Sequence, residues 1–315
     1  MTSSSEQQWT PLKVIDFSVD YLKARGVPEP RLDAELMLAH VLGWTRIDLY
    51  TRFEQPLKAD DLSTFREMLK KRGQRIPVKY LLGKTEFMSM EFKVTPAVLI
   101  PRPETEHLVE RAIEHLKSLD ASEPRLLDAG TGSGIVACSV AKHVEAARVV
   151  ATDISPEALQ VARENAEAIG VADRIAFAQA DMMQQLAPPD HPGPYHIIAS
   201  NPPYIAPHER ADLEPEVAEH EPGVALFSDD ALAPTRSILE QAPPLLADGG
   251  LVLIEIAFDA AEAVRASIDG VDGLEAEAFI MDYGDRPRVA VARKAGGWSG
   301  GRGVSSVIIN CSSSG

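Results

Sequence analysis

The sequence predicts a mixed α/β protein with a small all-helical domain, a β-hairpin linker and a seven-stranded, mostly parallel, doubly wound sheet. Three observations support this fold class. Apolar residues recur at helical spacing in the first 75 residues, apolar and polar residues alternate after Lys84, and apolar runs of strand length alternate with helical segments beyond Leu116. Strands separated by helices at this spacing form parallel sheets, because each parallel crossover needs a connecting element.

Residues 10–75 are predicted to form the helical domain, after a disordered segment at residues 1–9. Thr10 and Pro11 read as an N-cap followed by proline at the first helical position, and Gly26 follows the end of this helix. Further helices are expected at 31–42 and 60–72, with a short helical turn at 47–50. The domain shows no chemistry of its own and is either a packing module or a docking platform for a protein substrate.

Residues 76–104 are predicted to link the two domains. Lys84–Phe87 and Met90–Thr95 alternate apolar and polar residues and predict a hairpin, preceded by a connector at 74–82. The larger domain follows at 105–294, and a flexible tail rich in glycine and serine at 295–315.

The larger domain is expected to alternate strands and helices. Strands are predicted at 125–129, 148–152, 174–178, 195–200, 250–257, 274–280 and 288–293, and helices at 105–116, 134–144, 156–169, 232–246 and 259–268. The last two strands lack a long helix between them, so we expect an antiparallel pair at one edge of the sheet.

Composition and charge exclude several classes of protein. The net charge of −16 argues against nonspecific nucleic-acid binding, which needs a basic face. Two distant cysteines give no disulfide framework, and neither a signal peptide nor an apolar run of membrane-spanning length is apparent. His208 and Asp212 are more typical of a solvated helix face or loop than of a metal site. We expect a cytoplasmic monomer without a metal, a membrane or DNA as partner.

A glycine-rich turn between a strand and a helix predicts a cofactor site. Gly130, Gly132 and Gly134 let the backbone approach a ligand closely. The G-x-G-x-G spacing differs from the G-x-G-x-x-G of dinucleotide binders, so the helix N-terminus need not face a pyrophosphate. Asp128, just before the turn, either receives a cationic amino group or binds the backbone N–H groups of the loop itself.

Carboxylates at the ends of the next two strands specify the cofactor. Asp153 ends a strand about twenty residues after the turn, where it would accept hydrogen bonds from ribose hydroxyls, while Ser155 is the better helix cap. Asp181 and Met182 suit an adenine amino group and ring face, or form an ordinary loop. A nucleoside without a pyrophosphate indicates S-adenosylmethionine rather than NAD.

Asn201-Pro202-Pro203-Tyr204 is the candidate acceptor site. Two consecutive prolines cannot continue the strand at 195–200, so they fix an extended bend at its end. In open α/β sheets ligands bind at this edge. One carboxamide, one aromatic ring and rigid backbone carbonyls suit a planar amide or an amino-bearing ring.

The chain resembles the PrmC/HemK family of class I methyltransferases, the peptide chain release factor N5-glutamine methyltransferases, over residues 10–294. The similar segments are Arg31–Glu35, Ile100-Pro-Arg-Pro-Glu-Thr-Glu106, Asp128–Gly134, Ser200–Ile205, Glu221-Pro222 and Asp282–Val289. The resemblance implies a Rossmann-like domain that transfers a methyl group from S-adenosylmethionine to the GGQ-type glutamine of a release factor, and so modulates translation termination. The cofactor-binding residues would be Gly130, Thr131, Gly132, Ser133, Gly134, Asp153, Asp181, Met182 and Asn201. An aromatic residue is common in the family at the position of Met182.

Catalysis is expected to depend on orientation, with Asn201, Pro202 and Tyr204 as the catalytic residues. The side-chain oxygen of Asn201 and the carbonyl of Pro202 would accept the two hydrogens of the substrate amide, and Tyr204 would pack on the amide plane. Pro203 would complete the substrate-binding bend. Arg102 and Glu104 either shape the entrance or hold the domain junction.

Three other functions remain open from the sequence alone. An amino-methyltransferase acting on DNA adenine, or on another nucleic-acid base, would use the same Asn-Pro-Pro-Tyr bend on a flipped base. A S-adenosylmethionine-binding protein without catalysis is a second alternative. An NAD-dependent oxidoreductase is disfavoured by the spacing of the glycines.

Overall fold

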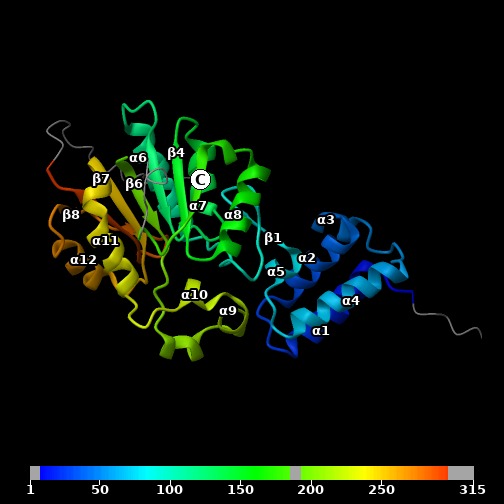
Figure 1. The fold of residues 1–315 in the computed structure, drawn as a ribbon. Helices are drawn as coiled ribbons and strands as arrows, with labels where there is room; N and C mark the ends of the chain where they lie inside the picture. Colours follow the sequence, from blue (N-terminus) through cyan, green and yellow to red (C-terminus); the bar gives the residue numbers. More distant parts are fainter. Residues whose placement is uncertain (1–7, 185–192, 297–315) are drawn as a thin grey trace, which may run out of the picture.

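The structure is a computed structural model that describes residues 8–184 and 193–296. It contains a helical domain and a larger sheet domain, joined by a small hairpin (Figure 1). The predicted flexible tail lies outside the described residues from 297 onward, and the predicted disordered start does so at residues 1–7. The boundaries proposed for the domains stay a prediction.

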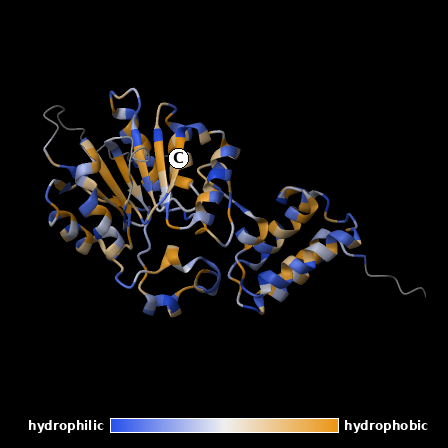
Figure 2. Ribbon diagram, in the orientation of Figure 1, coloured by the Kyte–Doolittle hydropathy of each residue, from blue (hydrophilic) through white to orange (hydrophobic). Residues whose placement is uncertain are grey.

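The helical domain consists of α1 (Pro11–Lys23), α2 (Pro30–Leu42), α3 (Arg46–Thr51), α4 (Ala59–Gly73) and α5 (Val78–Leu82). Ile15, Leu38 and Phe65 pack together at the centre of its own apolar core. The first four helices match the predicted ones within a few residues. The segment predicted as a connector at 74–82 contains α5, which was not predicted and is followed by Gly83 in the left-handed conformation. Figure 2 shows that hydrophobic residues, in orange, recur along these helices, and their buried members form this core.

The hairpin formed by β1 (Lys84–Phe87) and β2 (Met90–Lys93) is confirmed. Met88 and Ser89 both have positive φ angles, as a two-residue hairpin turn of this twist requires. The hairpin packs on the sheet domain, because Asn165 of α8 (Pro156–Ile169) binds both backbone groups of Lys93 at 2.7 and 3.0 Å. The same side chain donates to the carbonyl of Ser133 at 2.8 Å, so it also holds the glycine-rich turn.

The sheet domain contains the predicted doubly wound sheet. Its strands are β3 (Arg125–Ala129), β4 (Arg148–Asp153), β5 (Ile175–Gln179), β6 (Tyr195–Ser200), β7 (Leu246–Glu255), β8 (Leu274–Ala276), β9 (Ile280–Met281) and β10 (Pro287–Lys294). The order is β5-β4-β3-β6-β7-β10-β8, with β9 beside β10. Neighbours from β5 to β7 are parallel, and β10 is antiparallel to β7, β8 and β9, which confirms the antiparallel edge.

Two details of the sheet differ from the sequence prediction. The strand expected at 274–280 is interrupted at residues 277–279, so within the described residues the large sheet has eight strands instead of the predicted seven. The strand expected at 250–257 begins at Leu246. Glycine at position 250 lets the backbone of β7 lie close to the start of β6, because a Cβ there would lie 2.9 Å from the carbonyl oxygen of Ala247 and 3.1 Å from that of Tyr195.

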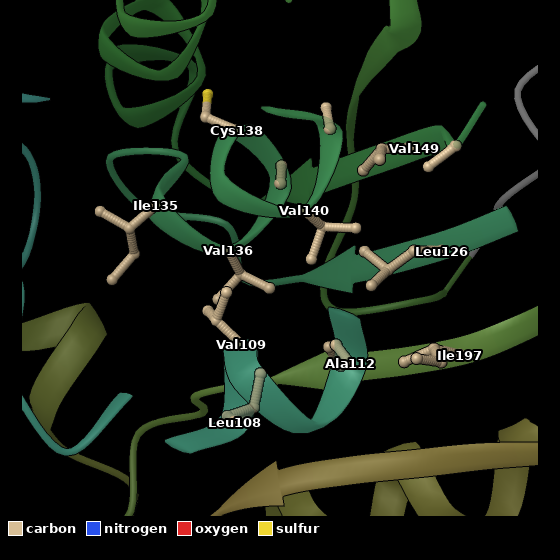
Figure 3. Packing of buried hydrophobic residues seen from close by; sticks show 14 of the residues in the cluster. Leu108, Val109, Ala112, Leu126, Ile135, Val136, Cys138, Val140, Val149 and Ile197 are labelled. Atoms are coloured by element: carbon tan, nitrogen blue, oxygen red, sulfur yellow. The ribbon is translucent and has the colours of Figure 1, made fainter. Parts of the chain in front are cut away.

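Helices cover both faces of the sheet. On one face α6 (Thr105–Ser118), α7 (Ile135–His143) and α8 enclose a core that includes Leu108, Leu126 and Ile197 (Figure 3). On the other face α11 (Ala233–Leu245) and α12 (Ala261–Asp269) pack over Ile198 and Val252. No helix in the described residues is long and apolar enough to cross a membrane.

A segment between β6 and α11 contacts the helical domain, and its helices were not predicted. It contains the 3-10 helix η2 (Pro207–Asp212), α9 (Pro215–His220) and α10 (Gly223–Leu226), and lies below the sheet beside the helical domain (Figure 1). Arg72 of α4 binds Asp33 of α2 at 2.6 Å and Glu216 of α9 at 2.7 Å. Arg72 is buried at this junction, so its charge is balanced by the carboxylates of Asp33 and Glu216 rather than by water.

Candidate active site

One cleft collects the residues that the sequence predicted at the ends of three separate strands. Gly130 follows β3, Asp153 ends β4 and Asn201 follows β6, and all three line the cleft together with Arg102 and Val224. Carboxyl ends of parallel strands meet at one edge of a sheet, which is where such folds bind ligands. The described residues hold no cluster of three or more His, Cys, Asp or Glu side chains suited to a metal ion.

The glycine-rich turn follows the edge of the sheet tightly. Gly130, Gly132 and Gly134 have φ angles of +76°, +56° and +83°, a region that other L-residues enter at a cost. The N–H groups of Gly130 and Thr131 donate to the carbonyl of Thr152 at 2.9 and 2.7 Å. The turn is therefore held by β4 before any ligand contacts it.

Asp128 supports the turn from below. Its carboxylate accepts hydrogen bonds from the Thr131 hydroxyl at 2.6 Å and from the N–H of Ala137 at 3.1 Å. Burial raises the pKa of this carboxyl to about 7. Asp128 therefore binds a side chain of the turn and a backbone N–H group of α7 (Ile135–His143) rather than backbone N–H groups of the turn, and it also lines the cleft.

Asp153 joins the turn to the next helix. It accepts from the N–H of Gly132 and from the N–H of Ser155, both at 2.9 Å. Ser155 caps α8 by accepting from the N–H of Ala158, as expected. Burial raises the pKa of Asp153. A carboxylate offers about four lone-pair sites, so Asp153 retains acceptors for the hydroxyls of a ribose.

Met182 lies next to the glycine-rich turn. Its sulfur would be 3.6 Å from a Cβ on Gly130, and its carbonyl accepts from the Thr152 hydroxyl at 2.6 Å. Its φ of +52° is strained for methionine, and such strain concentrates at ligand sites. The partly buried Met182 and the exposed Asp181 both line the cleft, so both adenine-binding candidates lie at the predicted place.

The Asn-Pro-Pro-Tyr bend approaches the cleft from the other side. Asn201 and Pro203 line it, whereas the buried Pro202 and the partly buried Tyr204 do not. Ser200 donates to the carbonyl of Ala129 at 2.7 Å, which fixes the end of β6 against the glycine-rich turn. Burial raises the pKa of Tyr204 to about 12, so this phenol stays neutral.

Two acidic residues support the site; Glu221 was named from the sequence only within a segment similar to the family, and Glu255 was not named. Glu221 is buried and binds Arg102 at 2.7 Å, so Arg102 both lines the cleft and holds the segment beyond α9. Glu255 is buried at the end of β7 and accepts from the Thr105 hydroxyl at 2.7 Å. The sequence signal for Glu255 is that it is the one carboxylate in the apolar run Leu251–Phe258, which indicates a buried acidic side chain.

The arrangement suits S-adenosylmethionine. The glycine-rich turn is open at Gly132, where a Cβ would meet nothing within 4 Å, so a ligand has space against the backbone. Asp153 and Asp181 offer acceptors for hydroxyl and amino groups, and Met182 an apolar surface. The spacing of the glycines differs from that of the turn that presents a helix N-terminus to a pyrophosphate.

Comparisons with known proteins agree with the fold and the site. A family model described as the PrmC N-terminal domain matches residues 13–83, and one described as the methyltransferase small domain matches residues 109–220. The catalytic domain of hMettl16 in complex with an RNA hairpin shares the fold, with a TM-score of 0.51 at 16% identity over 72% of this chain and 80% of that chain.

Curated relatives cover nearly the whole chain. A release factor glutamine methyltransferase of Chlorobaculum tepidum is 41% identical over 263 residues, which are 82% of this chain and 90% of the relative. One of Rhodopirellula baltica is 36% identical over 296 residues, or 93% and 99%. At this identity and coverage, the chain belongs to the family of release factor glutamine methyltransferases, enzymes that use S-adenosylmethionine as methyl donor.

Proposed function

We propose that this protein transfers the methyl group of S-adenosylmethionine to the side-chain amide nitrogen (N5) of a glutamine in a peptide chain release factor. The observation that carries the proposal is the convergence in one cleft of the glycine-rich turn and Asn201. The curated relatives, named for this activity and matched over most of their length, support the same substrate.

The proposed cofactor contacts follow the lining of the cleft. Residues 130–133 lie against the methionine part, Asp153 binds the ribose, and Asp181 and Met182 contact the adenine, whereas Gly134, also predicted to bind the cofactor, does not line the cleft. S-adenosylmethionine supplies an electrophilic methyl group on a sulfonium. The remaining task of the chain is to bring the acceptor nitrogen in line with the bond between sulfur and methyl carbon.

Asn201 and Pro202 are the proposed acceptor groups for the substrate amide. The nitrogen of a carboxamide is a weak nucleophile, because its lone pair is delocalised into the carbonyl. Accepting both amide hydrogens, at the Asn201 oxygen and the Pro202 carbonyl, orients this lone pair and favours the developing positive charge. The nitrogen gains the methyl group, the cofactor leaves as a neutral thioether, and the nitrogen returns one proton to solvent.

The neighbouring residues of the bend support this geometry. Pro202 and Pro203 restrict the backbone, and Tyr204 packs beside the amide and limits access of water. Residues 10–75 are proposed to dock the release factor, residues 76–104 to link the domains, and residues 105–294 to carry catalysis. We propose that the protein acts as a cytoplasmic monomer without binding DNA.

Mass spectrometry of methylated products tests this function. The protein is incubated with S-adenosylmethionine carrying a labelled methyl group, and with either a release factor or duplex DNA. We expect the label on one glutamine of the release factor, and no label on a matched release factor with that glutamine replaced by asparagine. Methylated adenine without methylated glutamine would overturn the proposal in favour of the nucleic-acid alternative.

A further inference from the structure

A chain of hydrogen bonds leads from the acceptor bend into the protein interior. The Asn201 side chain donates from Nδ2 to the Thr105 hydroxyl at 3.4 Å, and this hydroxyl donates to Oε2 of Glu255 at 2.7 Å. Thr105 begins α6 and Glu255 ends β7, 150 residues further along the chain. Thr105 and Glu255 are both buried. Asn201 lines the cleft, and Thr105 also borders it, so Thr105 lies between the cleft and buried Glu255.

The direction of each hydrogen bond in this chain follows from its chemistry. A carboxylate only accepts, and a threonine hydroxyl has one hydrogen. Once that hydrogen is given to Glu255, the Thr105 oxygen has only lone pairs left for Asn201. The amide group of Asn201 that faces Thr105 must therefore be the NH₂ group, and its Oδ1 is left for another partner.

We propose that Thr105 and Glu255 are positioning residues that select one of the two amide orientations of Asn201 and turn its oxygen toward the acceptor. This inference rests on the proposed function, in which that oxygen accepts a hydrogen from the substrate glutamine. With the opposite orientation, the NH₂ group of Asn201 would face the NH₂ group of the substrate glutamine. Both groups are donors, so no hydrogen bond could form between them.

The orientation of Asn201 depends on the charge of Glu255. The net pKa of Glu255 is about 7, because burial and nearby Glu104 raise it, whereas the hydrogen bond from Thr105 and the charges of Arg288 and Arg102 lower it. Tyr204 also faces this carboxyl and remains neutral. When Glu255 is protonated, its own O–H group donates a hydrogen bond to the Thr105 oxygen. The Thr105 hydroxyl then donates its hydrogen to Asn201, which must present Oδ1 to accept it. Acidification thus reverses the hydrogen bonds and the amide.

Nuclear magnetic resonance of asparagine side chains observes this reversal without any substrate. The chain contains three asparagines, Asn165, Asn201 and Asn310, so protein labelled with [¹⁵N]asparagine gives three NH₂ pairs, and Asn201→Asp assigns one of them. With S-adenosylmethionine bound, we expect the Asn201 pair to shift as the pH crosses about 7. Glu255→Gln, which does not titrate, should abolish this shift and leave the Asn165 pair unchanged.

Kinetics provide the second readout. Thr105→Val keeps the shape of the side chain but removes the hydroxyl, and we expect kcat to fall about tenfold, since one orienting hydrogen bond is lost. Thr105→Ser retains the hydroxyl and should stay within about threefold of wild type. Glu255→Gln should lose the acidic limb of the pH profile of kcat. The affinity for S-adenosylmethionine, which reports folding, should stay unchanged in all three variants.

Opposite outcomes separate the inference from the function on which it rests. If the wild type fails to methylate glutamine, the proposed function is wrong, whatever the variants do. If the wild type is active, and Thr105→Val matches it in kcat and in the Asn201 resonances, the positioning role is wrong. An acidic limb that persists in Glu255→Gln contradicts the assignment of the pH dependence to Glu255.

Discussion

Replacing Gly134 with alanine tests why the cofactor turn needs glycine at its third position. Gly134 has a φ of +83°, where an alanine costs about 1–2 kcal/mol. Its Cβ would also lie 3.1 Å from the Cβ and 3.3 Å from the Cα of Ala162 in α8, and such overpacking costs about 1–3 kcal/mol. The two effects predict a loss of about 2–5 kcal/mol in the free energy of unfolding.

Gly170→Ala is the matched control for this substitution. Gly170 has a φ of +79°, but an added Cβ would meet nothing within 4 Å, so only the backbone cost of about 1–2 kcal/mol applies. Chemical denaturation followed by circular dichroism measures both variants. The pair Gly134→Ala with Ala162→Gly should recover the overpacking part in a double-mutant cycle. Equal losses at Gly134 and Gly170, with no coupling to Ala162, would refute the close approach of α7 and α8.

Three further predictions concern charged residues. Asp153→Ala should raise the dissociation constant for S-adenosylmethionine about 10- to 100-fold in calorimetry, because hydrogen bonds to a charged group are lost; unchanged affinity would exclude Asp153 from the site. Arg72→Met should lower the free energy of unfolding by about 3–5 kcal/mol, because buried Asp33 loses its ion-pair partner while Glu216 keeps only Arg75, whereas exposed Lys70→Met should change it by about 0.5 kcal/mol or less. Because burial raises the pKa of Asp128 to about 7, the folded state retains a proton that the unfolded chain releases near pH 4, so this group makes stability fall as pH rises from 4 to 7. Asp128→Asn should remove that part of the slope in denaturation series across this pH range, and an unchanged slope would contradict the raised pKa of this buried carboxyl.

Local signals explain why much of the fold could be predicted from the sequence. Ser155 caps α8 with its own side chain, and Met88-Ser89 separates two alternating segments by two residues. The glycines of the cofactor turn mark positive φ angles one by one. Each of these features depends on a few consecutive residues, and a sequence shows those directly.

The missed features depend on partners that are distant in the sequence. Thr105 meets Glu255 across 150 residues, and Arg72 meets Glu216 across 144. The break between β8 and β9 depends on their pairing with β10, which the apolar pattern of 274–280 does not reveal. The cofactor residues could be predicted because each ends its own strand, whereas their supporting contacts could not.

The rate of methyl transfer by Asn201→Ala tests the central claim most directly. A single-turnover experiment with saturating release factor measures the transfer step, and calorimetry on the same sample measures binding of S-adenosylmethionine. We expect the rate to fall at least about 100-fold, corresponding to about 3 kcal/mol of transition-state stabilisation, and the affinity for the cofactor, which Asn201 is also predicted to contact, to fall by much less. A rate close to that of the wild type would contradict the role of Asn201 in holding the acceptor amide.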